Sequence, residues 1–320
     1  MTSGPTGKSF YKKSRFWHRE GTAFYCFIGL WLLGFVTLQL FPMLFGFYIS
    51  LTNFDGLSLA EARFVGLENY AEALRDSFLP YTFGRTLIYW VLSLSIGGAI
   101  ALGLALLLNR KMRGQGFFRT AFYLPTMVPM VVTTLLFGNL LAKDFGFLNL
   151  LLEKIRPGTN IDFVRDYGMV CMVALAVWSG TGVNMVMFLA GLQGIPEELK
   201  EAAEIDGATK WQVFRYVTWP LLSPITYFII LNGTIAAFQA IMPATLLSQV
   251  YGGWFSWQPP NSTYVTIAYI FVNMLNQSKF GYGAALTWIL FLVIMLFTLI
   301  IRAFGKRLVY YEVEQGGGEK

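Results

Sequence analysis

Residues 86–109 decide the fold of this chain, because TLIYWVLSLSIGGAIALGLALLLN contains no Asp, Glu, Lys or Arg. A helix needs about 20 predominantly apolar residues to cross the hydrocarbon core of a bilayer. Further uncharged windows of this length or longer lie at 21–54, 120–142, 167–196, 216–278 and 280–301. Of the 320 residues, 55% are hydrophobic and 13% are charged, whereas a soluble domain has about 25% charged residues. The sequence therefore predicts an all-α, polytopic membrane protein.

Six membrane-crossing helices fit these windows. We place them at 22–51, 83–108, 119–142, 167–192, 220–246 and 281–303. A further apolar stretch, 265–275, is too short to cross and suits an interfacial or re-entrant helix. The resulting organisation is a tail of residues 1–21, a transmembrane domain of residues 22–304 with a long loop at 193–219, and a second tail of residues 305–320.

The distribution of basic residues predicts the orientation. Loops rich in Lys and Arg stay on the cytoplasmic side of a membrane. The tail 1–21 holds five Lys and Arg residues against one acid, and the loop 109–118 holds three and no acid. Another basic cluster, 302–307, follows the last helix. Both termini are therefore expected in the cytoplasm, and the acidic loop 52–82 is expected outside.

The residue inventory argues against an enzyme. The only histidine, His18, lies in the basic tail, and the two cysteines, Cys26 and Cys171, lie in apolar windows. No metal site or cofactor is expected from such a set. The tail sequence GPTGKS (residues 4–9) ends like a phosphate-binding loop, but its first Gly is two positions too close and no strand precedes it. Any ATPase must then be a separate chain.

The loop 193–219 has chemistry of its own. Residues 195–222 read IPEELKEAAEIDGATKWQVFRYVTWPLL. Pro196 and two following acids predict a helix start, and Asp206-Gly207 predicts its end. Thr209 and Gln212 have the spacing of a capping box, which predicts a second helix. Two short helices joined by a turn are expected.

This loop resembles the EAA motif of the membrane subunits of bacterial ABC importers. The matching residues are Glu201, Ala202, Ala203, Asp206, Gly207, Ala208, Phe214, Val217, Pro220, Leu221 and Leu222. In that family the motif is the coupling loop, which docks into a groove on the cytoplasmic ATPase subunit. The resemblance implies the same role here, whereas a solvated surface loop is the alternative reading.

The resemblance covers nearly the whole chain and points to carbohydrate-type importers of the larger maltose-type permease branch. It rests on FPMLFGFYISLTNF (41–54), FFRTAFYLPTMVP (117–129) and WSGTGVNMVMFLAGLQGIP (178–196). It implies a type I permease fold in the bacterial cytoplasmic (inner) membrane. The implied partners are a second homologous permease, two cytoplasmic ATP-binding subunits, an extracytoplasmic solute-binding protein and a sugar or oligosaccharide. Residues 254–262 depart from the family pattern.

Uncharged polar residues within the spans are candidates for a sugar path, because sugar hydroxyls need reversible hydrogen bonds and sugar C–H faces pack on rings. The stronger candidates are Asn184, Asn232 and Gln239, the last two being expected on one helix face. The weaker candidates are Trp178, Tyr227, Phe228 and Tyr269. The alternative is structural, since amides also tie helices together and aromatic residues anchor helix ends at the interface.

Two other classes of function are open. A proton- or sodium-coupled secondary transporter is expected to keep a carboxylate within the membrane, and the predicted spans contain none. A non-transporting membrane scaffold has no need of a coupling loop. An importer subunit that forms half of a translocation path is therefore the favoured reading.

Overall fold

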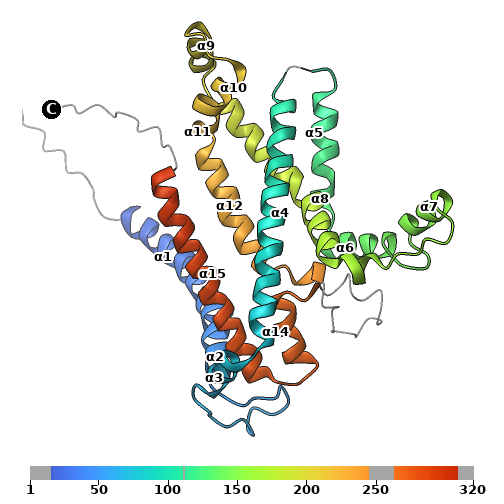
Figure 1. Ribbon diagram of the computed structural model, residues 1–320. Helices are drawn as coiled ribbons and strands as arrows, with labels where there is room; N and C mark the ends of the chain where they lie inside the picture. Colours follow the sequence, from blue (N-terminus) through green and yellow to red (C-terminus); the bar gives the residue numbers. More distant parts are fainter. Residues whose placement is uncertain (1–15, 111, 245–262, 309–320) are drawn as a thin grey trace, which may run out of the picture.

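The computed structural model describes residues 16–110, 112–244 and 263–308 (Figure 1), and all of its elements in these ranges are helical. Four stretches are long and apolar enough to cross a membrane as continuous helices: 24–50, 78–108, 163–194 and 280–305. They confirm four of the predicted spans. The corresponding elements are α1 (Phe16–Phe35), η1 (Val36–Leu40) and α2 (Phe41–Ser50), which run on as one span, and α4 (Phe78–Leu108), α8 (Phe163–Gly194) and α15 (Phe280–Leu308).

The third predicted helix, 119–142, is wrong as a single helix. It consists of α5 (Gln115–Tyr123), η2 (Leu124–Met127) and α6 (Met130–Leu140), and the two halves are bent by 95°. The break falls at Val128, whose backbone is extended (φ −81°, ψ 129°). A residue before proline avoids the helical region, and Pro129 follows. Proline thus turns one span into a bent pair.

The fifth predicted helix, 220–246, is also interrupted. α10 (Lys210–Val213), η3 (Phe214–Thr218) and α11 (Trp219–Leu221) lead into α12 (Ser223–Phe238), with a bend of 62° at Leu222. α12 starts with a proline, Pro224, in its first turn, where the missing N–H costs no helical hydrogen bond. It ends at Phe238, well before 246, and residues 245 and 246 lie outside the described part.

Shorter helices outside the spans include α3 (Glu68–Arg75), α7 (Phe147–Ile155) and α14 (Thr266–Leu275). α14 covers the predicted interfacial stretch 265–275. Its ten residues reach about 15 Å, half of a bilayer core. Figure 1 shows α14 and α3 at one end of the bundle and α9 (Glu197–Ile205) at the other.

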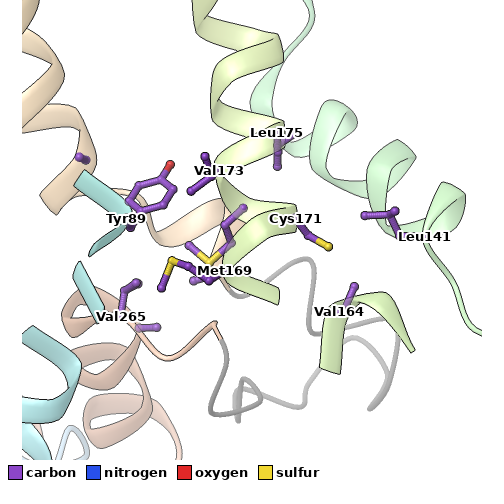
Figure 2. Close-up of a cluster of buried hydrophobic side chains, with 12 residues drawn as sticks. Tyr89, Leu141, Val164, Met169, Cys171, Val173, Leu175 and Val265 are labelled. Atoms are coloured by element: carbon purple, nitrogen blue, oxygen red, sulfur yellow. The ribbon is translucent and has the colours of Figure 1, made fainter. Parts of the chain in front are cut away.

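α4 and α8 pack closely against each other. Ala101 and Ala105 of α4 lie in one apolar cluster with Met185 and Phe188 of α8, and alanines let two helix backbones approach closely. A second cluster surrounds the N-terminal half of α8 and includes Tyr89 (Figure 2). By contrast, the span from Phe24 to Ser50 turns many apolar side chains outward, as a lipid-facing helix does.

Candidate functional site

A cavity of about 470 Å³ lies between α4, α8 and α12. It contains all three stronger sequence candidates, Asn184, Asn232 and Gln239. None of its lining residues is charged. Its volume falls in the range of small-molecule sites, about 300–1,000 Å³. The structure therefore brings the three amides together around one uncharged space.

The amides reach the cavity in different ways. Asn232, on α12, donates from Nδ2 to the carbonyl oxygen of Phe228 at 3.0 Å, so its Oδ1 is the atom available to an incoming donor. Gln239 is the C-cap of α12 (φ −103°, ψ 11°) and lines the same cavity seven positions after Asn232. Asn184 comes from the middle of α8.

The cavity also has hydroxyl groups that the sequence did not single out. They belong to Tyr89, Ser93 and Ser179. Ser179 Oγ donates to the carbonyl oxygen of Leu175 at 2.9 Å. Serine often makes this bond within a helix, so its presence in the sequence does not indicate a binding site. Only the relative placement of α4 and α8 identifies these residues as lining.

The four weaker aromatic candidates do not line this cavity. Trp178 packs against Phe137, with ring centroids 5.4 Å apart. Tyr227 lines a separate, mostly apolar cavity between α12 and α15. Phe228 is half exposed, and the Tyr269 hydroxyl is hydrogen-bonded at the α14 end of the bundle.

At the opposite end, the loop between α8 and α12 has the local structure that the sequence predicts. α9 spans Glu197–Ile205, and Gly207 follows in the left-handed conformation (φ +86°). The N–H groups of Gly207 and Ala208 donate to the carbonyl oxygens of Glu204 and Ala203, both at 3.0 Å. This pair of bonds is the Schellman ending of a helix. The next helix opens with the expected capping box, Gln212 Oε1 accepting from the N–H of Thr209 at 2.7 Å.

This loop presents apolar side chains to the surface. Ile205 is 86% exposed and Trp211 is 69% exposed. Glu201, Ala202 and Asp206 are exposed beside them. Phe214 is half-buried and stacks on Trp211, with ring centroids 5.5 Å apart. The motif residues therefore form a protruding surface of mixed apolar and acidic character, which the described residues of the chain leave uncovered.

Membrane-length helices around an uncharged cavity that holds three amides, with a protruding helical loop at one end, are typical of a polytopic membrane permease. Residues 96–310 match the family described as binding-protein-dependent transport system inner membrane component, and the chain belongs to this family.

The chain is similar to known permeases over nearly their full length. The chain is 30% identical over 313 residues to a probable ABC transporter permease protein, YesP, of Bacillus subtilis, covering 97% of this chain and 98% of that protein. It is 31% identical over 287 residues to the arabinooligosaccharides transport system permease AraP of Halalkalibacterium halodurans, covering 89% and 88%. Its fold is similar to a chain of a bacterial alginate ABC transporter solved with a loaded periplasmic protein (TM-score 0.77, 19% identity, 93% and 100% covered).

Proposed function

We propose that this permease moves a sugar or oligosaccharide into the cell and that the cavity between α4, α8 and α12 forms its half of the path. The observation that carries the proposal is the meeting of three amides, Asn184, Asn232 and Gln239, in one uncharged cavity. Amide and hydroxyl groups exchange hydrogen bonds with sugar hydroxyls without holding them too tightly. Similarity to an arabinooligosaccharide permease supports the same class of substrate.

The protruding loop supports the second part of the proposal, which is coupling to a separate ATPase. Exposed Ile205 and Trp211 lose their contact with water only if another protein covers them. The coupling loop 193–219 and both tails, 1–21 and 305–320, would then lie in the cytoplasm, flanking a transmembrane domain of residues 22–304. A second permease would complete the path, two ATP-binding subunits would drive it, and a solute-binding protein would dock at the α3 and α14 end.

A secondary transporter and a non-transporting scaffold are less favoured. Coupling to a cation gradient usually needs a membrane carboxylate, and no Asp or Glu lines the cavity. A scaffold role would explain neither the cavity nor the protruding loop.

The test is uptake by the reconstituted complex with Asn232→Leu and Gln239→Leu combined. Labelled arabinotriose and maltotriose are the probes. Loss of two hydrogen bonds, each worth about 1 kcal/mol, should lower uptake of the accepted sugar about tenfold or more, with insertion and ATPase association unchanged. Equal uptake would reject the cavity as the path.

The chain offers a matched control in Asn139→Leu. Asn139, on α6, donates to the carbonyl oxygen four residues earlier at 3.0 Å, as Asn232 does, but does not line the cavity. This variant should transport normally. A similar loss in the control would show that such amides act only in helix packing.

A further inference from the structure

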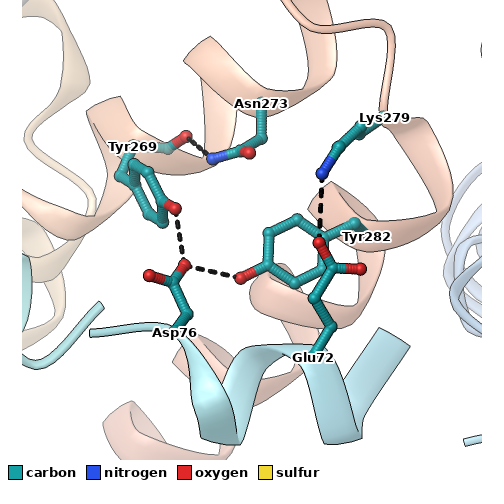
Figure 3. A network of polar contacts seen from close by, with 6 residues as sticks. All are labelled: Glu72, Asp76, Tyr269, Asn273, Lys279 and Tyr282. Carbon is teal, nitrogen blue, oxygen red and sulfur yellow. Dashed lines mark hydrogen bonds and ion pairs between the residues drawn. The ribbon is translucent and has the colours of Figure 1, made fainter. Parts of the chain in front are cut away.

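Asp76 joins three helices at the α14 end of the bundle (Figure 3). It caps the C-terminus of α3, just before α4. Its Oδ2 accepts hydrogen bonds from the hydroxyl groups of Tyr269 on α14, at 2.5 Å, and Tyr282 on α15, at 2.7 Å. Its Oδ1 accepts from the N–H of Phe78 at 2.8 Å. One carboxylate therefore fixes α3, α14 and α15 to one another.

The carboxylate is held in its charged form. Burial raises the pKa of Asp76, but hydrogen bonds from Tyr269, Tyr282 and the backbone N–H groups of Phe78 and Leu79 oppose this and leave the pKa below its usual value. Hydrogen bonds to an ionised acceptor are shorter and stronger than neutral ones. The two tyrosines donate to the same charged oxygen, so Tyr269 links Asp76 to α14 and Tyr282 links it to α15.

α14 in turn reaches the wall of the cavity. At its start, the N–H of Thr266 donates to Oγ1 of Thr86 on α4 at 2.9 Å. Val265 and Ala268 are buried in the same cluster as Tyr89, and Tyr89 also lines the cavity. Figure 2 shows Val265 and Tyr89 at neighbouring places in this cluster. The position of α14 thus influences the packing behind the cavity wall.

We propose that Asp76 is a positioning residue for transport. It ties α14 to α3 and α15 and thereby limits opening of the cavity at this end until a binding protein displaces the α3 segment. The proposal rests on the proposed function, which puts this end outside. It differs from a purely structural role in one respect. Release of Asp76 should increase access to the cavity from the outside without unfolding the chain.

The neighbouring ion pair provides a comparison within the same surface. Lys279 Nζ lies 3.0 Å from Glu72 Oε1, and both side chains are about half exposed. It also joins α3 to the segment before α15, yet it does not contact α14 through its charged atoms. An exposed pair of this kind contributes little. Breaking it should leave access to the cavity unchanged.

The experiment measures access to the cavity rather than transport. Ala236, which is exposed and lines the cavity, is changed to Cys in a chain with Cys26→Ser and Cys171→Ala. Intact cells expressing the full complex are treated with a membrane-impermeant maleimide. Labelling should be about tenfold faster with Asp76→Ala, which corresponds to about 1.4 kcal/mol in the opening equilibrium. Tyr269→Phe with Tyr282→Phe should give a similar rise, Asp76→Asn a smaller one, and Glu72→Gln none.

Two additional measurements make each outcome decisive. Combining Asp76→Ala with the two Phe changes should add nothing further, since both remove the same contacts. Thermal unfolding of the purified complex identifies a variant that has lost its fold, in which case the Tyr269→Phe, Tyr282→Phe variant decides. Unchanged labelling in that variant, or an equal rise with Glu72→Gln, would overturn the proposal.

The proposed orientation is checked separately. Glu61→Cys, in the exposed loop before α3, should label from outside in every background. If it labels only in inverted vesicles, the orientation is wrong. The labelling of Ala236→Cys with and without Asp76→Ala is then compared in those vesicles. The same ratio of labelling rates supports the role proposed for Asp76, and equal rates reject it.

Discussion

The two ends of this permease are built by different kinds of contact. At the α9 end, the capping box joins Thr209 to Gln212, three residues apart, and the Schellman bonds span only residues 203–208. At the α14 end, Asp76 is joined to Tyr269 and Tyr282, which follow 193 and 206 residues later. The first arrangement depends on local sequence, whereas the second depends on the whole fold.

The two ends also differ in which side chains they leave exposed. At the α9 end, Ile205 of α9 and Trp211 of α10 lie at the surface. The local hydrogen bonds there are complete, but this apolar area is not covered by the described residues of the chain. The α14 end pairs its acid within the chain and buries Tyr282 to 4% exposure. The exposed apolar residues at the α9 end favour docking to another protein. The paired Asp76 at the α14 end favours a role within the chain. Changes at the two ends should therefore fail in different ways.

The largest effect is expected from Gly281→Ala, which tests the non-local end. A Cβ at Gly281 would lie 2.0 Å from the carbonyl oxygen of Thr52 and 3.2 Å from Nδ2 of Asn69, which itself donates to that oxygen. The loop would have to move, at a cost of about 3 kcal/mol. Thermal unfolding of the purified chain should show a clear fall in midpoint temperature. Gly98→Ala, where nothing lies within 4 Å, is the control, and equal midpoints would contradict the tight packing.

A smaller effect is expected from Gly207→Val at the local end. Nothing lies within 4 Å of the added Cβ, so the whole cost is backbone strain at φ +86°, about 1–2 kcal/mol. Global unfolding should change little. Association with the ATPase should weaken, because the angle between α9 and α10 changes. Co-purification at increasing detergent stringency measures this.

The control at this position is Gly207→Asn, because asparagine tolerates the left-handed conformation. It should keep most of the association. If valine and asparagine weaken the ATPase contact equally, the side chain itself and not the turn would be responsible.

The smallest effect concerns pH at the α14 end. Because the pKa of Asp76 is lowered in the folded chain, its carboxylate contributes stability that is complete above the unfolded pKa of about 3.9 and is lost as pH falls through the folded value. The difference in unfolding temperature between the wild type and Asp76→Asn should therefore be constant from about pH 6 to pH 8. A difference that fades near pH 6 would contradict the lowered pKa of Asp76.

The sequence predicted whatever depends on composition and on near neighbours. Uncharged windows located four continuous spans, and Gly207, Thr209 and Gln212 located the ends of two short helices, because capping involves residues a few positions apart. The motif around Glu201 was readable for the same reason. Even the breaks had a local signal in Pro129 and Pro224, although prolines are common in membrane helices and do not by themselves fix a bend angle.

Only the tertiary structure decided which side chains meet. Asn184 of α8 meets Asn232 and Gln239 at the cavity because α8 and α12 pack together, which spacing along one helix does not show. Tyr269, a candidate for the path, instead donates to Asp76. In a chain of mostly apolar spans, every helix has several faces that lipid or protein could cover, so periodicity does not choose its neighbours. Close packing of α4, α8, α12, α14 and α15 determines which faces meet. It thereby forms the cavity and the contacts of Asp76 with Tyr269 and Tyr282.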